Sequence, residues 1–93
     1  MRLGFVLTKE QGTHGRLGWE HVQTVLEVSG SPDELAPRLR PWALDLVTRE
    51  RGGDGRYFAY LVELDDNGEF DTYLALSMVD VIWFYEQEYV PVS

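Results

Sequence analysis

The chain has 93 residues and a formal net charge of −8, and 44% of its residues are hydrophobic. This length predicts a single acidic domain over residues 1–93, because two half-sized domains could not each bury a core. The hydrophobic fraction excludes a disordered chain, and no apolar run approaches the roughly 20 residues that span a bilayer. The absence of cysteine excludes disulfides and thiolate chemistry. We therefore expect a small, soluble, cytoplasmic protein.

The first third of the chain predicts two strands and a loop. Residues 2–8 are a short apolar run of β-favouring type, and residues 20–29 alternate apolar with polar side chains. Residues 9–18 contain three glycines, which is typical of a connecting loop. A helix over the second apolar segment is the alternative.

The next segment predicts a helix. Ser31-Pro32-Asp33-Glu34 combines a capping serine, a proline suited to the first turn and a glutamate three residues after the serine. Apolar residues then recur at helical spacing, at Leu35, Leu39, Trp42, Leu46 and Val47. Because Pro37 and Pro41 each remove a backbone donor, we expect an irregular start over 32–40. A regular helix should follow from about residue 41 to 50 and end at the glycines of 52–55.

Residues 56–65 and 69–77 predict a β-hairpin. A two-residue turn at Asn67-Gly68 would mix core-facing and solvent-facing residues. A three-residue loop over 66–68 instead pairs Leu64 with Phe70, which keeps one face apolar. It also places Gly68 where a left-handed residue is needed.

Residues 77–90 favour a helix, since Ser77 and Asp80 form a second capping pattern and Pro91 follows. The run 81–85 keeps a buried strand open as the alternative. The resulting order is β-β-α-β-β-α. This order predicts a two-layer α+β sandwich, with an antiparallel four-stranded sheet and two helices on one face. A ferredoxin-like arrangement is one option.

The negative charge is concentrated at the carboxyl-terminal end of the chain. Residues 57–93 contain eight acidic residues and no basic one, whereas residues 38–56 carry a net positive charge. A negative field of this kind repels nucleic-acid phosphates and anionic lipid, and it attracts basic proteins. We therefore expect a basic protein partner, with no direct nucleic-acid and no membrane partner. Solubility alone is the simpler explanation of the same charge.

The sequence gives little support to catalysis or metal binding. The only histidines, His14 and His21, lie outside any metal-binding motif. The run 65–71 differs from a calcium loop, because its glycine is at the fourth position rather than the sixth. No serine lies in a nucleophile motif. We expect no catalytic residue, no metal site and no cofactor. An enzyme or ligand pocket near His14, Arg16 or His21 is the least supported hypothesis.

These patterns predict a non-enzymatic protein-binding module, such as an acidic inhibitor of the immunity or antitoxin type, which docks its partner through residues 57–73. Its candidate binding residues are the carboxylates Glu63, Asp65, Asp66, Glu69 and Asp71 and the anchors Tyr57, Tyr73 and Trp83. The alternative is a homo-oligomeric structural or accessory domain, a homodimer for example, with the aromatic segment 78–90 as its interface.

Overall fold

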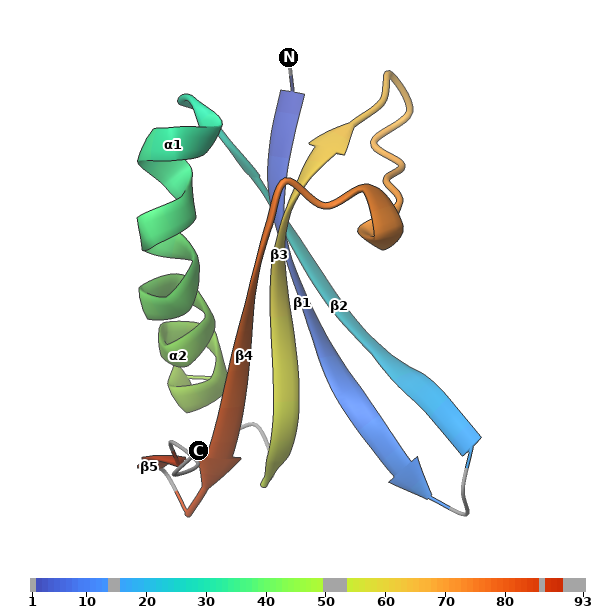
Figure 1. Cartoon of the computed structure of the whole chain (residues 1–93), viewed down its shortest axis with the longest axis vertical. Coiled ribbons are helices and arrows are strands. Elements are labelled where there is room, and N and C mark those ends of the chain that lie inside the picture. Colours follow the sequence, from blue (N-terminus) through green and yellow to red (C-terminus); the bar gives the residue numbers. More distant parts are fainter. Residues whose placement is uncertain (1, 14–15, 50–53, 86, 90–93) are drawn as a thin grey trace.

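Within the residues that the computed structural model describes, five strands form one antiparallel sheet in the order β2-β1-β3-β4-β5 (Figure 1). The strands are β1 (Arg2–Thr13), β2 (Arg16–Val28), β3 (Gly55–Leu64), β4 (Ser77–Phe84) and β5 (Gln87–Tyr89). The helical segment between β2 and β3 comprises α1 (Pro32–Leu35), η1 (Ala36–Arg38) and α2 (Leu39–Arg49). The structure describes residues 2–13, 16–49, 54–85 and 87–89, and for residues 10–24 it describes only the backbone.

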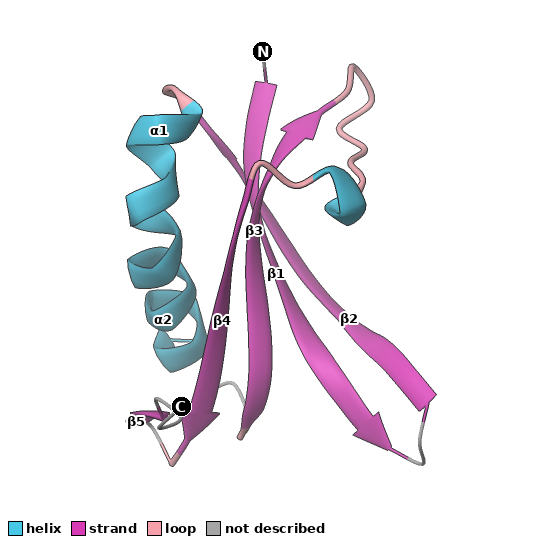
Figure 2. Cartoon of the chain, viewed as in Figure 1, coloured by secondary structure: helices cyan, strands magenta, loops and turns pink. Residues whose placement is uncertain are grey.

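The helical segment covers one face of the sheet, so the α+β class is confirmed (Figure 2). The apolar stripe of the helix packs on alternate residues of β1, β3 and β4. The buried residues of this core are Leu3, Phe5, Leu7, Leu35, Leu39, Ala43, Leu46, Val47, Tyr57, Ala59, Leu61, Val81 and Trp83. Trp42 is partly buried against them, with its ring centroid 5.1 Å from that of Phe5. We call the opposite side of the sheet its far face.

The start of the helix follows the sequence prediction. The Ser31 side chain accepts a hydrogen bond from the Glu34 N–H at 3.3 Å, which satisfies one of the free donors of the first turn. The segment then passes through the 3₁₀ turn η1 before the regular helix α2 begins at Leu39. The irregularity coincides with Pro37, as its missing N–H requires. The glycines at 52 and 53 lie outside the described residues.

Both amino-terminal strands are confirmed, but the predicted loop over residues 9–18 is wrong. The β1–β2 pairing continues to Thr13↔Arg16, and the glycines lie within the ladder at Gly12↔Leu17 and Gln11↔Gly18. Only residues 14 and 15 separate the two strands, and they lie outside the described residues. Because β3 pairs with β1 only as far as Lys9, the remainder of the two strands extends beyond the sheet as a two-stranded arm (Figure 1).

The predicted hairpin between residues 56–65 and 69–77 is wrong beyond its turn. β3 pairs with β4 instead, from Leu61↔Ser77 to Gly55↔Trp83. The segment after the turn forms the short 3₁₀ helix η2 (Thr72–Leu74), whose N-cap side chain, Asp71, accepts from the Tyr73 N–H at 2.9 Å. Such a local side-chain bond offers the backbone an alternative to strand pairing.

The predicted helix over residues 77–90 is also wrong, and with it the count of four strands and two helices. The segment forms β4 and β5, and Val81 and Trp83 are buried beneath the helix. Its β-branched and aromatic residues fit a pleated surface better than a helix. The short helix η2 makes the turn that leads into β4, although the segment has no glycine. The Leu76 N–H then donates to the Leu61 carbonyl at 2.8 Å. Tyr85, with φ of +48°, makes the next turn.

Candidate functional site

The connection between β3 and β4 lies on the far face and carries most of the predicted charged residues (Figure 1). We call residues 65–76 the acidic loop, because four carboxylates fall within twelve positions: Asp65, Asp66, Glu69 and Asp71. Phe70 and Ala75 attach this loop by packing on a second, smaller core on the far face. The buried residues of that core are Val6, Val62 and Leu64.

A tight turn opens the acidic loop. The Asp65 N–H donates to the Glu69 carbonyl at 3.0 Å, which closes the predicted three-residue loop over 66–68. One Asp65 carboxylate oxygen accepts from the Asn67 N–H and the Glu69 N–H, each at 2.8 Å. Gly68 adopts φ of +78°, so its predicted left-handed conformation is confirmed. The turn therefore fixes the Asp65 carboxylate through two backbone N–H groups.

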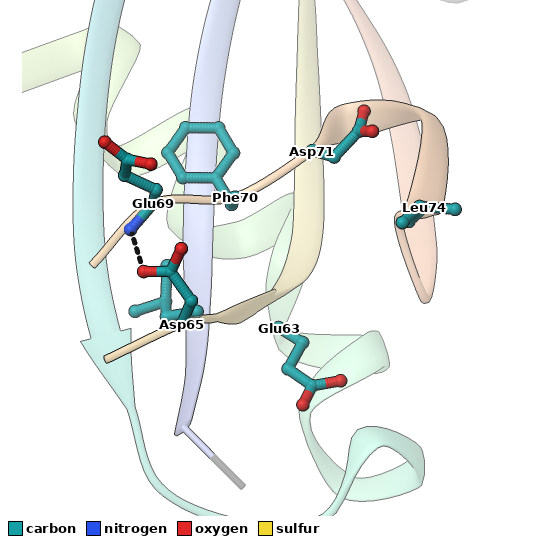
Figure 3. A pocket seen from close by; sticks show the side chains of 7 residues that line it. Glu63, Asp65, Glu69, Phe70, Asp71 and Leu74 are labelled. Atoms are coloured by element: carbon teal, nitrogen blue, oxygen red, sulfur yellow. Dashed lines mark hydrogen bonds between the residues drawn. The ribbon is translucent and has the colours of Figure 1, made fainter. Parts of the chain in front are cut away.

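A pocket of about 430 Å³ lies between the end of β3 and the acidic loop (Figure 3). Four acidic and three apolar residues line it: Glu63, Asp65, Glu69, Asp71, Leu64, Phe70 and Leu74. Figure 3 shows Asp65 and Glu69 together on one side of the pocket and Asp71 with Leu74 on another. No lining residue is basic, so the pocket concentrates negative charge beside an apolar wall.

Glu63, Asp65, Glu69 and Asp71 all line this pocket. Leu3, the cross-strand partner of Glu63, is buried beneath the helix, so the Glu63 side chain points to the helix side of the sheet, away from the other three (Figure 3). Asp65 and Asp71 are oriented by backbone N–H donors. In the described part of the chain, no donor lies within hydrogen-bond distance of the Glu63 or Glu69 carboxylates. Like charges around one pocket repel one another, and salt or a cationic ligand relieves the repulsion.

Arg2 anchors the start of the acidic loop. Its guanidinium donates to the backbone carbonyls of Asp65 and Asp66, at 3.1 and 3.4 Å. Its other nitrogens bond the Glu27 carboxylate at 3.0 and 3.2 Å. The hydrogen bond and the charge of Arg2 lower the pKa of Glu27, which in turn raises the pKa of Arg2. Asp66 therefore contributes a carbonyl to this clamp, and its side chain does not line the pocket.

The predicted aromatic anchors are divided between surface and core. Tyr73 is 96% exposed on η2, next to Leu74, which is itself exposed. Tyr57 and Trp83, by contrast, are buried beneath the helix, so their prediction as surface anchors is corrected. Both occupy strand positions that alternate with outward-facing residues, and the alternation turns them inward. Burial accordingly raises the pKa of Tyr57.

Sequence reasoning missed the apolar wall and the arginine clamp. Leu64 and Phe70 were expected in the core of a hairpin, and Leu74 was paired with a residue of β3. Phe70 stands alone between acidic neighbours, which could have indicated an apolar residue that anchors a charged loop. Arg2 is the first basic residue of the chain, and nothing in its local sequence indicates a partner more than sixty positions away.

No group of three or more acidic or histidine side chains among the described residues could hold a metal ion. His14 is outside the described residues, and so are the side chains of Arg16 and His21, so the ligand-pocket hypothesis stays a prediction. In the described ranges, no helix is long and apolar enough to cross a membrane.

The chain was compared with models of known protein families, with curated proteins and with solved structures, and no match was found in any of the three comparisons.

Proposed function

We propose that this chain is a protein-binding module, an acidic inhibitor of the immunity or antitoxin type, which receives a basic segment of its partner in the pocket beneath the acidic loop. The pocket carries this proposal because acidic residues and an apolar wall line it together. Lysine and arginine side chains have the matching construction, with an apolar stem and a cationic head. A carboxylate-lined pocket therefore offers ion pairs to the head and Leu64, Phe70 and Leu74 to the stem.

Tyr73 extends this surface. Its side chain is almost fully exposed on η2 beside the pocket residue Leu74. Exposed tyrosines often anchor protein interfaces, because a rigid ring buries a large area at small conformational cost. We therefore assign ion pairing to Asp65, Glu69 and Asp71, and we assign apolar anchoring to Tyr73.

The negative field supports the same kind of partner at longer range. The net charge of −8 speeds the encounter with a basic protein, and the pocket then provides short-range contacts. A hexa-arginine peptide is a direct probe, since it presents the proposed chemistry without an identified partner. We expect its affinity to fall as salt rises, because screening weakens exposed ion pairs.

The discriminating variant is Glu69→Gln with Asp71→Asn, which removes two pocket charges, keeps side-chain size and leaves the Oδ1 that accepts from the Tyr73 N–H. Its matched control is Asp33→Asn with Glu34→Gln, which removes two exposed charges from the first turn of α1, on the other side of the sheet. Measured by fluorescence anisotropy at low salt, the pocket variant should bind labelled hexa-arginine about tenfold more weakly. The control should bind nearly as the parent does. Equal losses in both variants would reduce the effect to net charge and contradict the pocket.

The natural partner can be sought with the same three proteins. Each is tagged and used to capture proteins from the native lysate, and the captured proteins are identified by mass spectrometry. A basic protein held by the parent and the control but absent with the pocket variant would support the proposal. A protein captured equally by all three would bind elsewhere on the molecule.

A further inference from the structure

The far face of the sheet is apolar well beyond the part that the acidic loop covers. Because Val81 and Trp83 face the helix, their neighbours on β4 face the opposite way. Three exposed or half-exposed apolar side chains of β4 lie there, with one from β5: Met78, Ile82, Phe84 and Tyr89. We call these four residues the open patch. Met78 and Tyr89 are each 54% exposed and Phe84 is 48% exposed.

The neighbouring strand, β3, has buried apolar residues on both of its faces. β3 buries Tyr57, Ala59 and Leu61 towards the helix, and it buries Phe58 and Val62 on the far face. Strands with apolar residues on both faces are typical of sheets that lie between two layers. Here the helix forms one layer, and the acidic loop supplies a second layer only around Val62 and Leu64.

The open patch is electrically neutral, in contrast to the acidic pocket. Among the described residues, the charges beside it are Arg56 and Asp80, which form an ion pair with each other, with one nitrogen–oxygen distance of 2.9 Å. A basic partner would therefore gain no charge attraction here. Two copies of this chain, each with a net charge of −8, repel one another, and a neutral apolar face is where that repulsion opposes contact least.

The solvent-exposed area of the molecule is larger than a compact monomer of its mass should have. The chain exposes 6583 Å², whereas a compact monomer of 10.7 kDa should expose about 5500 Å². The excess is roughly 1000 Å². A standard protein interface takes about 800 Å² from each partner. The excess is thus of the size that an interface between two copies would remove.

We infer that a second copy of this chain covers the open patch, so that two sheets pack face to face with their helices outside. Such a two-fold contact places Phe84 and Tyr89 of each copy against the same surface of the other, which completes the second layer that β3 lacks. It also brings the Arg56–Asp80 pairs of both copies into one region, where each arginine has two aspartates within reach. The acidic pocket lies towards the other end of the face and stays available for its own partner.

Sedimentation velocity over the micromolar range tests this inference with three variants. Phe84→Lys and Met78→Lys each place a charge in the open patch. Leu26→Lys is the matched control, because Leu26 is 46% exposed but lies opposite Phe5, on the helix side of the sheet. The parent should sediment at twice its monomer mass, and so should the control. The two patch variants should dissociate with an increase in Kd of about tenfold or more.

Circular dichroism of each variant separates lost association from lost folding, and Met78→Lys replaces Phe84→Lys if the latter unfolds. A parent that remains monomeric throughout the range would overturn the inference and leave the patch to a different protein. Dimers that survive both patch substitutions, or that dissociate in the Leu26→Lys control, would overturn it as well, because the contact would then lie on another surface.

Discussion

Replacement of Phe70 by alanine tests how the acidic loop is held in place. Phe70 is half-buried, and its ring packs against the small core on the far face of the sheet. Removing a fully buried phenylalanine ring costs about 3–5 kcal/mol. Because this ring is partly exposed and the loop can settle onto the space it leaves, we expect a loss of about 1–2 kcal/mol. The corresponding fall in Tm is about 5–15 °C for a domain of this size.

The assay is urea unfolding followed by circular dichroism, with Tyr73→Ala as the control. Tyr73 is an aromatic residue of the same loop, but it is 96% exposed, so its removal should change the free energy of unfolding by less than about 0.5 kcal/mol. Binding of hexa-arginine gives a second, independent measurement. Phe70→Ala should weaken both stability and binding, because it releases the pocket wall. Tyr73→Ala should weaken binding alone.

These two variants together can refute the reasoning. Equal stabilities of Phe70→Ala and Tyr73→Ala would show that the loop is not attached through the Phe70 ring. Full binding by Phe70→Ala despite a measured loss of stability would show that the probe does not use the pocket.

Three further substitutions test local features of the fold. Ser31→Ala removes the helix cap and should lower the free energy of unfolding by about 1 kcal/mol in urea. Gly68→Ala should cost about 1–2 kcal/mol in the same assay, because alanine tolerates a φ of +78° poorly, although the space around it is open. Glu27→Gln tests the clamp on Arg2. Since the folded pKa of Glu27 is lowered from 4.5, the pair stabilises the fold above that pH and loses its effect as pH falls through the folded pKa. The stability difference between parent and Glu27→Gln should therefore be present at neutral pH and shrink as pH falls below 4.5 and through the lowered pKa of Glu27; a constant difference would contradict the pairing.

Local signals in the sequence predicted the parts of the fold that local forces determine. Ser31 caps its helix and Gly68 turns its loop because each conformation depends on a few neighbouring atoms. The helical stripe was likewise predictable, since one face of a helix must be apolar if it covers a sheet. The tight turn between Asp65 and Glu69 was also predictable, because it depends on the few residues within it.

Strand partners were not predictable, because they depend on competition between distant segments. The run 69–76 alternates as a strand would, yet Asp71 satisfies the Tyr73 N–H locally and starts a helical turn. β4 then takes the place beside β3, where Val81 and Trp83 bury more apolar surface than the nearer segment offers. A capping pattern at Ser77 could not outweigh this gain, because propensity is weaker than tertiary packing.

Most residues of the candidate site could be predicted from the sequence, but their arrangement in space could not. The predicted hairpin and the observed pocket use the same acidic residues, but only the pocket places an apolar wall beside them. That wall exists because β4 takes the place beside β3 and leaves Phe70 to pack on the far face. The pairing error and the pocket thus have one cause. Once β4 is a strand of this sheet, its alternation buries Trp83 and exposes Phe84, which explains the error at Trp83. The error at Tyr57 has a different cause, because the helix covers the face of β3 on which Tyr57 lies. The aromatic surface expected at the acidic loop is therefore divided. Tyr73 remains beside the pocket, whereas Phe84 and Tyr89 lie on a neutral patch that a charged partner has no reason to prefer. The two surfaces should therefore respond to salt in opposite ways. Salt should weaken binding of a basic partner at the pocket, and it should strengthen association of two copies at the open patch, because it screens the repulsion between two acidic chains.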